Sequence, residues 1–212
     1  PILRQLDPVN ALTLSGLFFS FGVVMFAILG QFYLAALFMM YAGLIDLFDG
    51  FFAKRAKRTP EASAAGPELD SLIDICAFGF APAIFAYCFG LQGTLSIALL
   101  IAYIGVNALR LAYFNQAGLS SNEQNNYYTG LPVTYAALFI PAIFSLRLFL
   151  PDETLKQILF CLYALMALAM ISSMPIRKLT GIWYAIFSVG ALLLTIIYVR
   201  AILAQIPRYN LQ

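Results

Sequence analysis

The chain has 212 residues, of which 62% are hydrophobic and only 10% are charged. Soluble domains average about 45–50% apolar and about 25% charged residues, so this composition argues against a soluble protein and excludes a disordered one. The net charge of +2 gives no argument for nucleic-acid binding. The sequence contains no histidine, so acid–base chemistry must fall to carboxylates. We therefore expect an integral membrane protein.

Apolar runs follow one another along the chain, each close to the roughly 20 residues that a membrane-spanning helix needs. They cover about 9–30, 32–54, 68–90, 93–114, 131–150, 154–174 and 180–204. The first run begins after Asp7 and Pro8, a cap residue followed by a proline, which is typical of a helix start. The sequence predicts an all-α polytopic fold with one membrane-embedded domain over residues 1–212.

Two connections, 54–66 and 115–130, are long and polar. Lysine and arginine are enriched in cytoplasmic loops, which places the basic 54–66 connection inside. Alternation of the helices then puts eight of the twelve basic residues on that side: Arg4, Lys54, Arg55, Lys57, Arg58, Arg110, Arg177 and Lys178. The opposite side keeps Arg147, Lys156, Arg200 and Arg208.

Four of the ten acidic residues crowd into one region of the apolar runs. Asp46 and Asp49 are three residues apart and Asp70 and Asp74 are four apart, so each pair shares a helix face. Small residues continue the first of these faces, which leaves a groove that a backbone or a ligand can approach: Gly43, Gly50 and Ala53. Antiparallel packing of the two runs would bring all four carboxylates together.

An aspartate near the centre of a membrane costs about 2.5–3.5 kcal/mol, so the cluster needs positive charge. Oxygen ligands without histidine or cysteine suit Mg²⁺, Mn²⁺ or Ca²⁺, and four carboxylates suffice for a two-metal site. One alternative is that the acids pair with the basic residues of the 54–58 segment. Another is a cation-coupled transporter, although no internal repeat is visible.

The acidic segment reads D-x-x-D-G-x-x-A-K from Asp46 to Lys54, then G-x-x-x-D-x-x-x-D from Gly66 to Asp74. It resembles the signature of the CDP-alcohol phosphotransferases, D-x-x-D-G-x-x-A-R followed by a loop and G-x-x-x-D-x-x-x-D. The chain departs from the signature twice. Lys54 stands in place of the arginine, with Arg55 one position later, and the loop of eleven residues before Gly66 is longer.

Further stretches are similar to the membrane-type phosphatidylserine synthase subgroup, namely 68–74, 78–83, 109–115, 130–132 and 172–177. The branches that use glycerol phosphate or inositol carry a basic residue after the last aspartate, where this chain has Ile75. The resemblance covers most of residues 8–180. The last helix would then be an addition to a common set of six.

The resemblance implies an enzyme of a prokaryotic cytoplasmic membrane whose active site faces the cytoplasm. It would transfer a phosphatidyl group from CDP-diacylglycerol to L-serine, giving phosphatidylserine and CMP, with Mg²⁺ or Mn²⁺ as cofactor. Choline, inositol or glycerol phosphate are the alternative acceptors. The resemblance also implies a homodimer.

Mapped onto this chain, the resemblance implies that Asp46, Asp49 and Asp70 hold metal ions, and that Asp74 acts as general base and also touches a metal. The residues expected at the nucleotide and diphosphate are Asn10, Thr13, Gly50, Ala53, Lys54, Arg55 and Gly66. Asn10 could equally cap the first helix. Arg110 and Ser71 are assigned to the acceptor, because the paired donors of the Arg110 guanidinium suit a carboxylate. The alternative is that Arg110 only extends its charged end from the helix toward the membrane surface. The polar segment 120–126 could form a lid, and a solvated loop is its ordinary interpretation.

Overall fold

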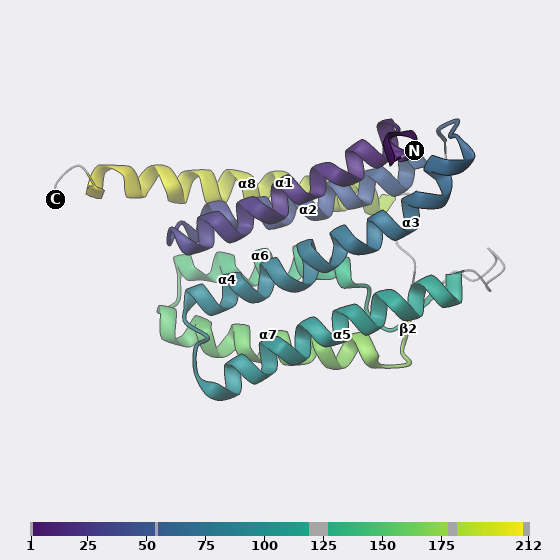
Figure 1. Ribbon diagram of the computed structural model, residues 1–212. Helices are drawn as coiled ribbons and strands as arrows, with labels where there is room; N and C mark the ends of the chain where they lie inside the picture. Colours follow the sequence, from purple (N-terminus) through teal and green to yellow (C-terminus); the bar gives the residue numbers. More distant parts are fainter. Residues whose placement is uncertain (1, 54, 119–126, 178–181, 210–212) are drawn as a thin grey trace.

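The computed structural model describes residues 2–53, 55–118, 127–177 and 182–209. Its helices lie side by side along one common direction (Figure 1). Six of them are long and apolar enough to cross a membrane, which confirms the predicted integral membrane protein. The helices are η1 Ile2–Gln5, α1 Pro8–Ile28, α2 Phe32–Ala53, α3 Pro60–Asp74, η2 Ile75–Phe80, α4 Ala81–Phe89, α5 Thr94–Gly118, η3 Val133–Tyr135, α6 Ala136–Phe144, η4 Ser145–Leu148, α7 Asp152–Ile171 and α8 Ile182–Tyr209.

The start of α1 is fixed by Asp7, as the sequence predicts. Its side chain accepts a hydrogen bond from the Asn10 backbone N–H at 2.7 Å, and Pro8 occupies the first turn, where a missing N–H is harmless. Asn10 is therefore not the capping residue, which corrects one of the two readings of that position. Its side chain instead donates to the carbonyls of Gln5 and Ala62.

The third apolar run begins earlier than predicted. The helix starts at Pro60, because Thr59 caps it by accepting a hydrogen bond from Ala62 N at 3.2 Å. The following Ala-rich stretch then favours the helix, and Pro67 is accommodated inside it. The expected 54–66 connection is thus only the segment 54–59, and Gly66 lies on α3 rather than in a loop.

Helices α3, η2 and α4 form one continuous span, Pro60–Phe89, of 30 residues. Its middle, η2, is a π-helical turn that begins directly after Asp74. Pro82 has no N–H to give to the Phe78 carbonyl four residues earlier. The buried hydroxyl of Tyr103 on α5 donates to that carbonyl at 2.6 Å, so the irregular turn keeps its polar groups paired inside the membrane.

The fifth apolar run forms a shorter helix than the other six, over Val133–Leu148. It starts after Pro132 and has 3-10 turns at both ends, η3 and η4, around α6. Pro141 lies inside α6, and its carbonyl accepts a hydrogen bond from the Tyr198 hydroxyl of α8. The predicted run 131–150 is therefore a helix, but not one of full spanning length.

Two short strands, β1 Tyr127–Thr129 and β2 Pro175–Arg177, pair antiparallel with Tyr128 opposite Ile176. This ribbon is the one departure from the predicted all-α fold among the described residues. It lies at the same end of the bundle as the N-terminal residues and the connection between α2 and α3, as the alternation of the runs predicts (Figure 1). Segment 120–126 lies outside the described residues.

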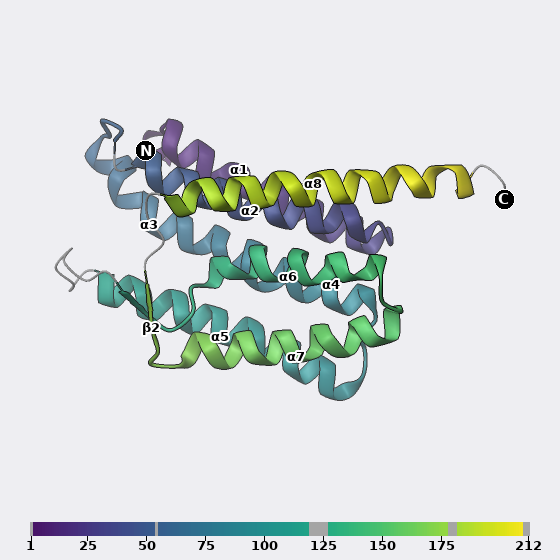
Figure 2. The ribbon, with the colours of Figure 1, turned by 180° about the vertical axis from the view of Figure 1, so that it is seen from behind.

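Helix α8 runs alongside α2 and extends beyond the other helices toward the C-terminal end (Figure 2). The Tyr41 and Thr195 hydroxyls, 3.1 Å apart, join α2 to α8. On the other side α2 approaches α6 closely at Gly43, where a Cβ would lie 2.6 Å from the Ala137 Cβ. The small-residue face predicted on α2 therefore serves helix packing at this position.

We predict that Tyr103→Phe lowers stability, because it removes the hydrogen bond to the Phe78 carbonyl in an apolar interior. A typical intramolecular hydrogen bond contributes about 0.5–1.5 kcal/mol. The thermal unfolding midpoint in detergent, measured against Tyr113→Phe at an exposed position of the same helix, tests this. Equal midpoints for the two variants would contradict it.

Candidate active site

Three carboxylates of the predicted cluster meet in the structure. Asp46 and Asp49 of α2 and Asp70 of α3 each offer an oxygen atom within 4.8 Å of the others. Ligands on opposite sides of a Mg²⁺ ion lie about 4.2 Å apart, twice the usual Mg–O distance. The spacing and the all-oxygen donor set therefore fit a hard divalent cation such as Mg²⁺ or Mn²⁺.

Asp74 completes the cluster from the end of α3. Its carboxyl lies within hydrogen-bonding reach of the Asp46 carboxyl, and its side chain is only 7% exposed. It follows Gly66 and Asp70 at intervals of four residues, so the three share one face of the helix. The Thr13 hydroxyl of α1 reaches the Asp49 carboxylate from the other side.

The described residues do not neutralise this cluster with ion pairs. Their ion pairs join Arg58 to Asp7, Arg147 to Asp152 and Lys156 to Glu153, all away from the four aspartates. The alternative that the acids pair with the 54–58 segment is therefore wrong for its described residues. Four close carboxylates without cations repel each other, so the geometry calls for bound positive charge.

A cavity of about 500 Å³ opens between α1, the start of α3 and the end of α5. Gly50 faces open space there, and no atom lies within 4 Å of where its Cβ would be. Most residues assigned to the nucleotide line this cavity, and so does Ser71: Asn10, Thr13, Gly50, Ala53 and Gly66. Asp49, Asp70 and Asp74 form its inner wall.

A second cavity of about 270 Å³ lies on the other side of the aspartates, between α2, α5 and η3. Arg110 lines it and is only 7% exposed, and its buried Nε has no hydrogen-bond partner among the described residues. Tyr128 of β1 lies on the same wall. The two cavities share Gly50, Asp70 and Asp74, so they meet at the carboxylates. The structure does not bring Ser71 together with Arg110.

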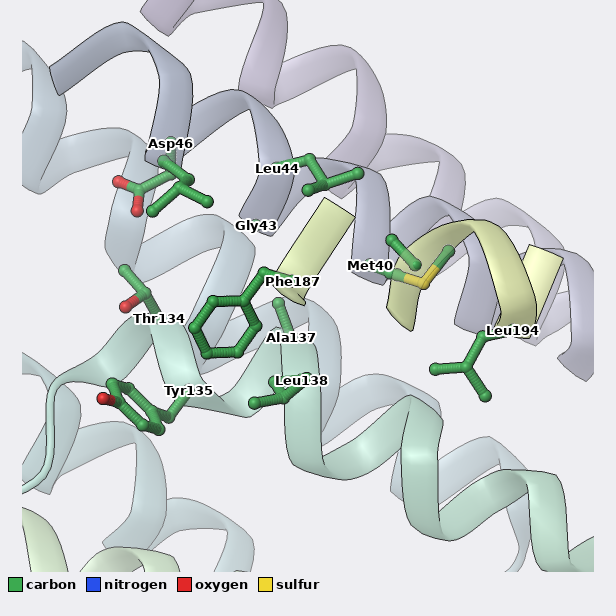
Figure 3. Close-up of a pocket in the computed structure, with 12 residues that line it drawn as sticks. Met40, Gly43, Leu44, Asp46, Thr134, Tyr135, Ala137, Leu138, Phe187 and Leu194 are labelled. Atoms are coloured by element: carbon green, nitrogen blue, oxygen red, sulfur yellow. The ribbon is translucent and has the colours of Figure 1, made fainter. Parts of the chain in front are cut away.

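An apolar groove leads away from the cluster between α2, α6 and α8. Figure 3 shows Asp46 and Thr134 at one end and Met40 and Leu194 at the other. Asp46, Thr134 and Tyr135 line both this groove and the second cavity, so the two are continuous. Phe187, from the last helix, also borders the groove.

The basic residues after α2 differ in whether they line a cavity. The Arg55 side chain is exposed and lies on the Phe51 ring, 3.7 Å from its centroid, and it does not line either cavity. Lys54 lies outside the described residues. Arg58 instead lines the larger cavity, although the family signature assigns it no role there.

Other residues at the site were also missed, among them Ser63, Asn115, Tyr128, Thr134 and Tyr135. Their only sequence signal is that several neighbour the stretches that carry the resemblance. They come from four separate elements, so no local spacing could single them out.

The arrangement defines a membrane-embedded site in which a cluster of acidic side chains, spaced to suit divalent cations, lies between two cavities. A model of the CDP-alcohol phosphatidyltransferase family matches residues 8–169, so the chain belongs to that family. The family membership leaves the transporter alternative without support. The α8 helix lies beyond the matched residues, as the resemblance implies.

Individual relatives narrow the comparison. The CDP-diacylglycerol–serine O-phosphatidyltransferase of Saccharomyces cerevisiae is 34% identical over 53% of this chain. The enzyme of the same name from Helicobacter pylori (strain 26695) is 32% identical over 62% of it. An archaetidylserine synthase of Methanothermobacter thermautotrophicus is 32% identical over 57% of it. The matched regions cover 42%, 54% and 50% of these relatives, so the chain spans about half their length.

A pH prediction follows from the ion pair beside the larger cavity. The hydrogen bond from Arg58 holds the pKa of the Asp7 carboxyl below its ordinary value. The stability from this pair is therefore present above the unfolded pKa of about 3.9 and is lost as the pH falls through the lower folded value. In Asp7→Asn, which keeps a good helix cap, this part of the acid-induced loss should disappear. Unfolding midpoints from pH 2 to 6 check this, and parallel profiles for the two proteins would contradict it.

Proposed function

We propose that this protein transfers the phosphatidyl group of CDP-diacylglycerol to the hydroxyl of L-serine, giving phosphatidylserine and CMP. The observation that carries the proposal is that two cavities meet at one cluster of four aspartates. A transfer between two substrates needs their reacting atoms side by side, with the charge of the diphosphate neutralised at that point.

The CDP group fits the larger cavity. Gly50 leaves room for a ligand against α2, and Asn10 and Thr13 supply polar groups from α1. Asp46, Asp49 and Asp70 would hold Mg²⁺ or Mn²⁺, which when bound neutralises the diphosphate and stabilises CMP as the leaving group. Asp74 lies at the junction and would also touch a metal ion.

The acceptor fits the smaller cavity. Asp74 takes the proton of the acceptor hydroxyl. At the same time the oxygen of that hydroxyl forms a bond to the phosphorus attached to the diacylglycerol. The bond from that phosphorus to the bridging oxygen breaks, and CMP leaves. Asp74 suits this role because it lines both cavities. It is therefore within reach of a hydroxyl that faces the diphosphate.

Serine is the acceptor that the site and the relatives favour. The buried Arg110 lines the acceptor cavity, and a guanidinium pairs well with a carboxylate. Choline and inositol lack an anionic group for this arginine, whereas glycerol phosphate has one. The relatives named as serine phosphatidyltransferases, together with an archaetidylserine synthase, support serine over glycerol phosphate.

The apolar groove fits an acyl chain of the lipid substrate. It begins at Asp46, beside the proposed diphosphate position, and continues along α6 and α8 into the apolar part of the bundle (Figure 3). Each methylene group that enters such a groove from water contributes about 0.8 kcal/mol. The last helix would then help to bind the lipid.

The orientation and the assembly are also proposals. The basic residues gather at the end of the bundle that holds the aspartates, which favours a cytoplasmic active site by the charge rule. Localisation to a prokaryotic cytoplasmic membrane and a homodimeric state stay predictions from the family resemblance.

The central test is CMP release by the purified protein with CDP-diacylglycerol and Mn²⁺ or Mg²⁺. We expect release that depends on serine, and a loss of about 10²-fold or more in Asp74→Asn, because general-base catalysis contributes about 10²–10⁴-fold. Glu68→Gln, an exposed acid of the same helix that lines neither cavity, is the matched control.

Release with choline, inositol or glycerol phosphate but not with serine would overturn the acceptor assignment alone. No release with any of these acceptors, from folded protein supplied with metal, would overturn the proposed reaction.

A bulky residue in the groove tests the lipid position. Leu194→Trp should raise the KM for a long-chain CDP-diacylglycerol severalfold, because the indole occupies space that the acyl chain needs. Leu193→Trp, at an exposed position of the same helix, controls for the substitution itself. The same KM in the two variants would contradict the assignment of the groove.

A further inference from the structure

Arg58 is held at the wall of the larger cavity by an unusually complete set of contacts. Its Nε donates to Asp7 at 2.7 Å, and its Nη2 donates to the Asn10 side chain at 2.5 Å and to the Ala62 carbonyl at 2.9 Å. Asn10 is itself fixed, because its amide donates to the carbonyls of Gln5 and Ala62. The guanidinium is therefore held by the segment before α1, by α1 itself and by the first turn of α3.

The absence of a side chain at Gly66 leaves room for the Arg58 guanidinium. A Cβ at position 66 would lie 3.1 Å from Arg58 Nη1, 3.3 Å from Nη2 and 3.4 Å from the Asn10 Oδ1. The two distances to the guanidinium are tighter than ordinary contacts, so a side chain here would push the guanidinium by a few tenths of an ångström. In this chain the glycine of the signature thus makes room for a basic residue that the signature does not contain.

One nitrogen of Arg58 remains available. No described residue accepts a hydrogen bond from Nη1, whereas Nε and Nη2 are engaged. The side chain is only 11% exposed, yet Arg58 lines the cavity together with Ser63 and Gly66. A buried arginine with an unengaged nitrogen at a cavity wall is a donor for a ligand there.

We propose that Arg58 donates hydrogen bonds to the nucleoside end of the CDP group, and that Asp7 and Asn10 are positioning residues that hold it there. The inference rests on the proposed function, because it names how that site recognises its nucleotide. It assigns the role to a residue outside the signature, in a chain whose Arg55 is turned to the exterior.

The positions of residues along α3 indicate that Arg58 contacts the nucleoside end of the CDP group rather than the diphosphate. The carboxylates that would hold the metal ions and the diphosphate include Asp70, whereas Arg58 packs against Gly66, one helical turn before it. One turn is about 5–6 Å along the axis, so the next part of the ligand, the ribose or the cytosine, lies beside Arg58. The cytosine carbonyl and the ribose hydroxyls are acceptors for such a donor.

The test compares two soluble probes, CDP and inorganic diphosphate, by calorimetric titration of the detergent-solubilised 212-residue protein with Mn²⁺. Arg58→Gln should weaken CDP binding about tenfold or more, because it removes a charged hydrogen bond, and should leave diphosphate binding within about twofold. Arg58→Lys should recover part of the affinity. Asp7→Asn should weaken CDP binding by a smaller factor, since the arginine stays but loses its anchor.

Lys57→Gln is the matched control, because it removes an exposed positive charge from the same connection. We expect it to bind both probes like the wild type. Unfolding midpoints identify any variant that has lost its fold, and Arg58→Lys and Asp7→Asn keep the test decisive if Arg58→Gln unfolds.

Three outcomes would overturn the inference while leaving the proposed function standing. They are unchanged CDP binding in Arg58→Gln, equal weakening of CDP and diphosphate, and equal weakening in Lys57→Gln. A folded wild type that binds diphosphate but not CDP would overturn the proposed function together with the inference.

Discussion

The mutual repulsion of four aspartates inside a membrane-embedded bundle is the constraint on which the rest of this structure depends. Carboxylates at this depth are costly, and among the described residues no basic side chain pairs with them. Bound cations would offset this cost, and the all-oxygen donor set suits them. The helices around the cluster are accordingly arranged to admit ligands, with an open cavity on each side of it.

The irregular path of the helix over residues 60–89 is linked to the position of Asp74 in the acidic cluster. A regular helix through residues 60–89 would include two internal prolines, and the π-helical turn η2 begins at the point where Asp74 must face the junction. Backbone groups freed by such a turn are tolerated inside a membrane only when another group pairs with them. Tyr103 provides that partner for Phe78, so a residue far from the chemistry maintains the path of the helix beside Asp74.

Binding of the nucleotide and of the lipid draws on segments outside the signature. The residues before α1 fix Arg58, and α8 borders the apolar groove that starts at Asp46. In the proposed reaction, the aspartates supply the chemistry common to the family. The flanking elements then decide how the two ends of the lipid nucleotide are held.

The sequence by itself determined the helical membrane fold and the identity of the acidic cluster, because hydrophobic runs and i, i+3 or i, i+4 spacing are local properties. It also placed the ends of the bundle correctly, since alternation follows from counting spans. It could not separate Arg55 from Arg58, which lie in one basic segment and differ only in which way they turn. Tertiary structure decided that choice, because Arg58 is held by Asp7 and Asn10, which are distant along the chain, and packs against Gly66 of the next helix. The division of the site into two cavities and a groove was likewise set by packing, to which six separate α-helices contribute.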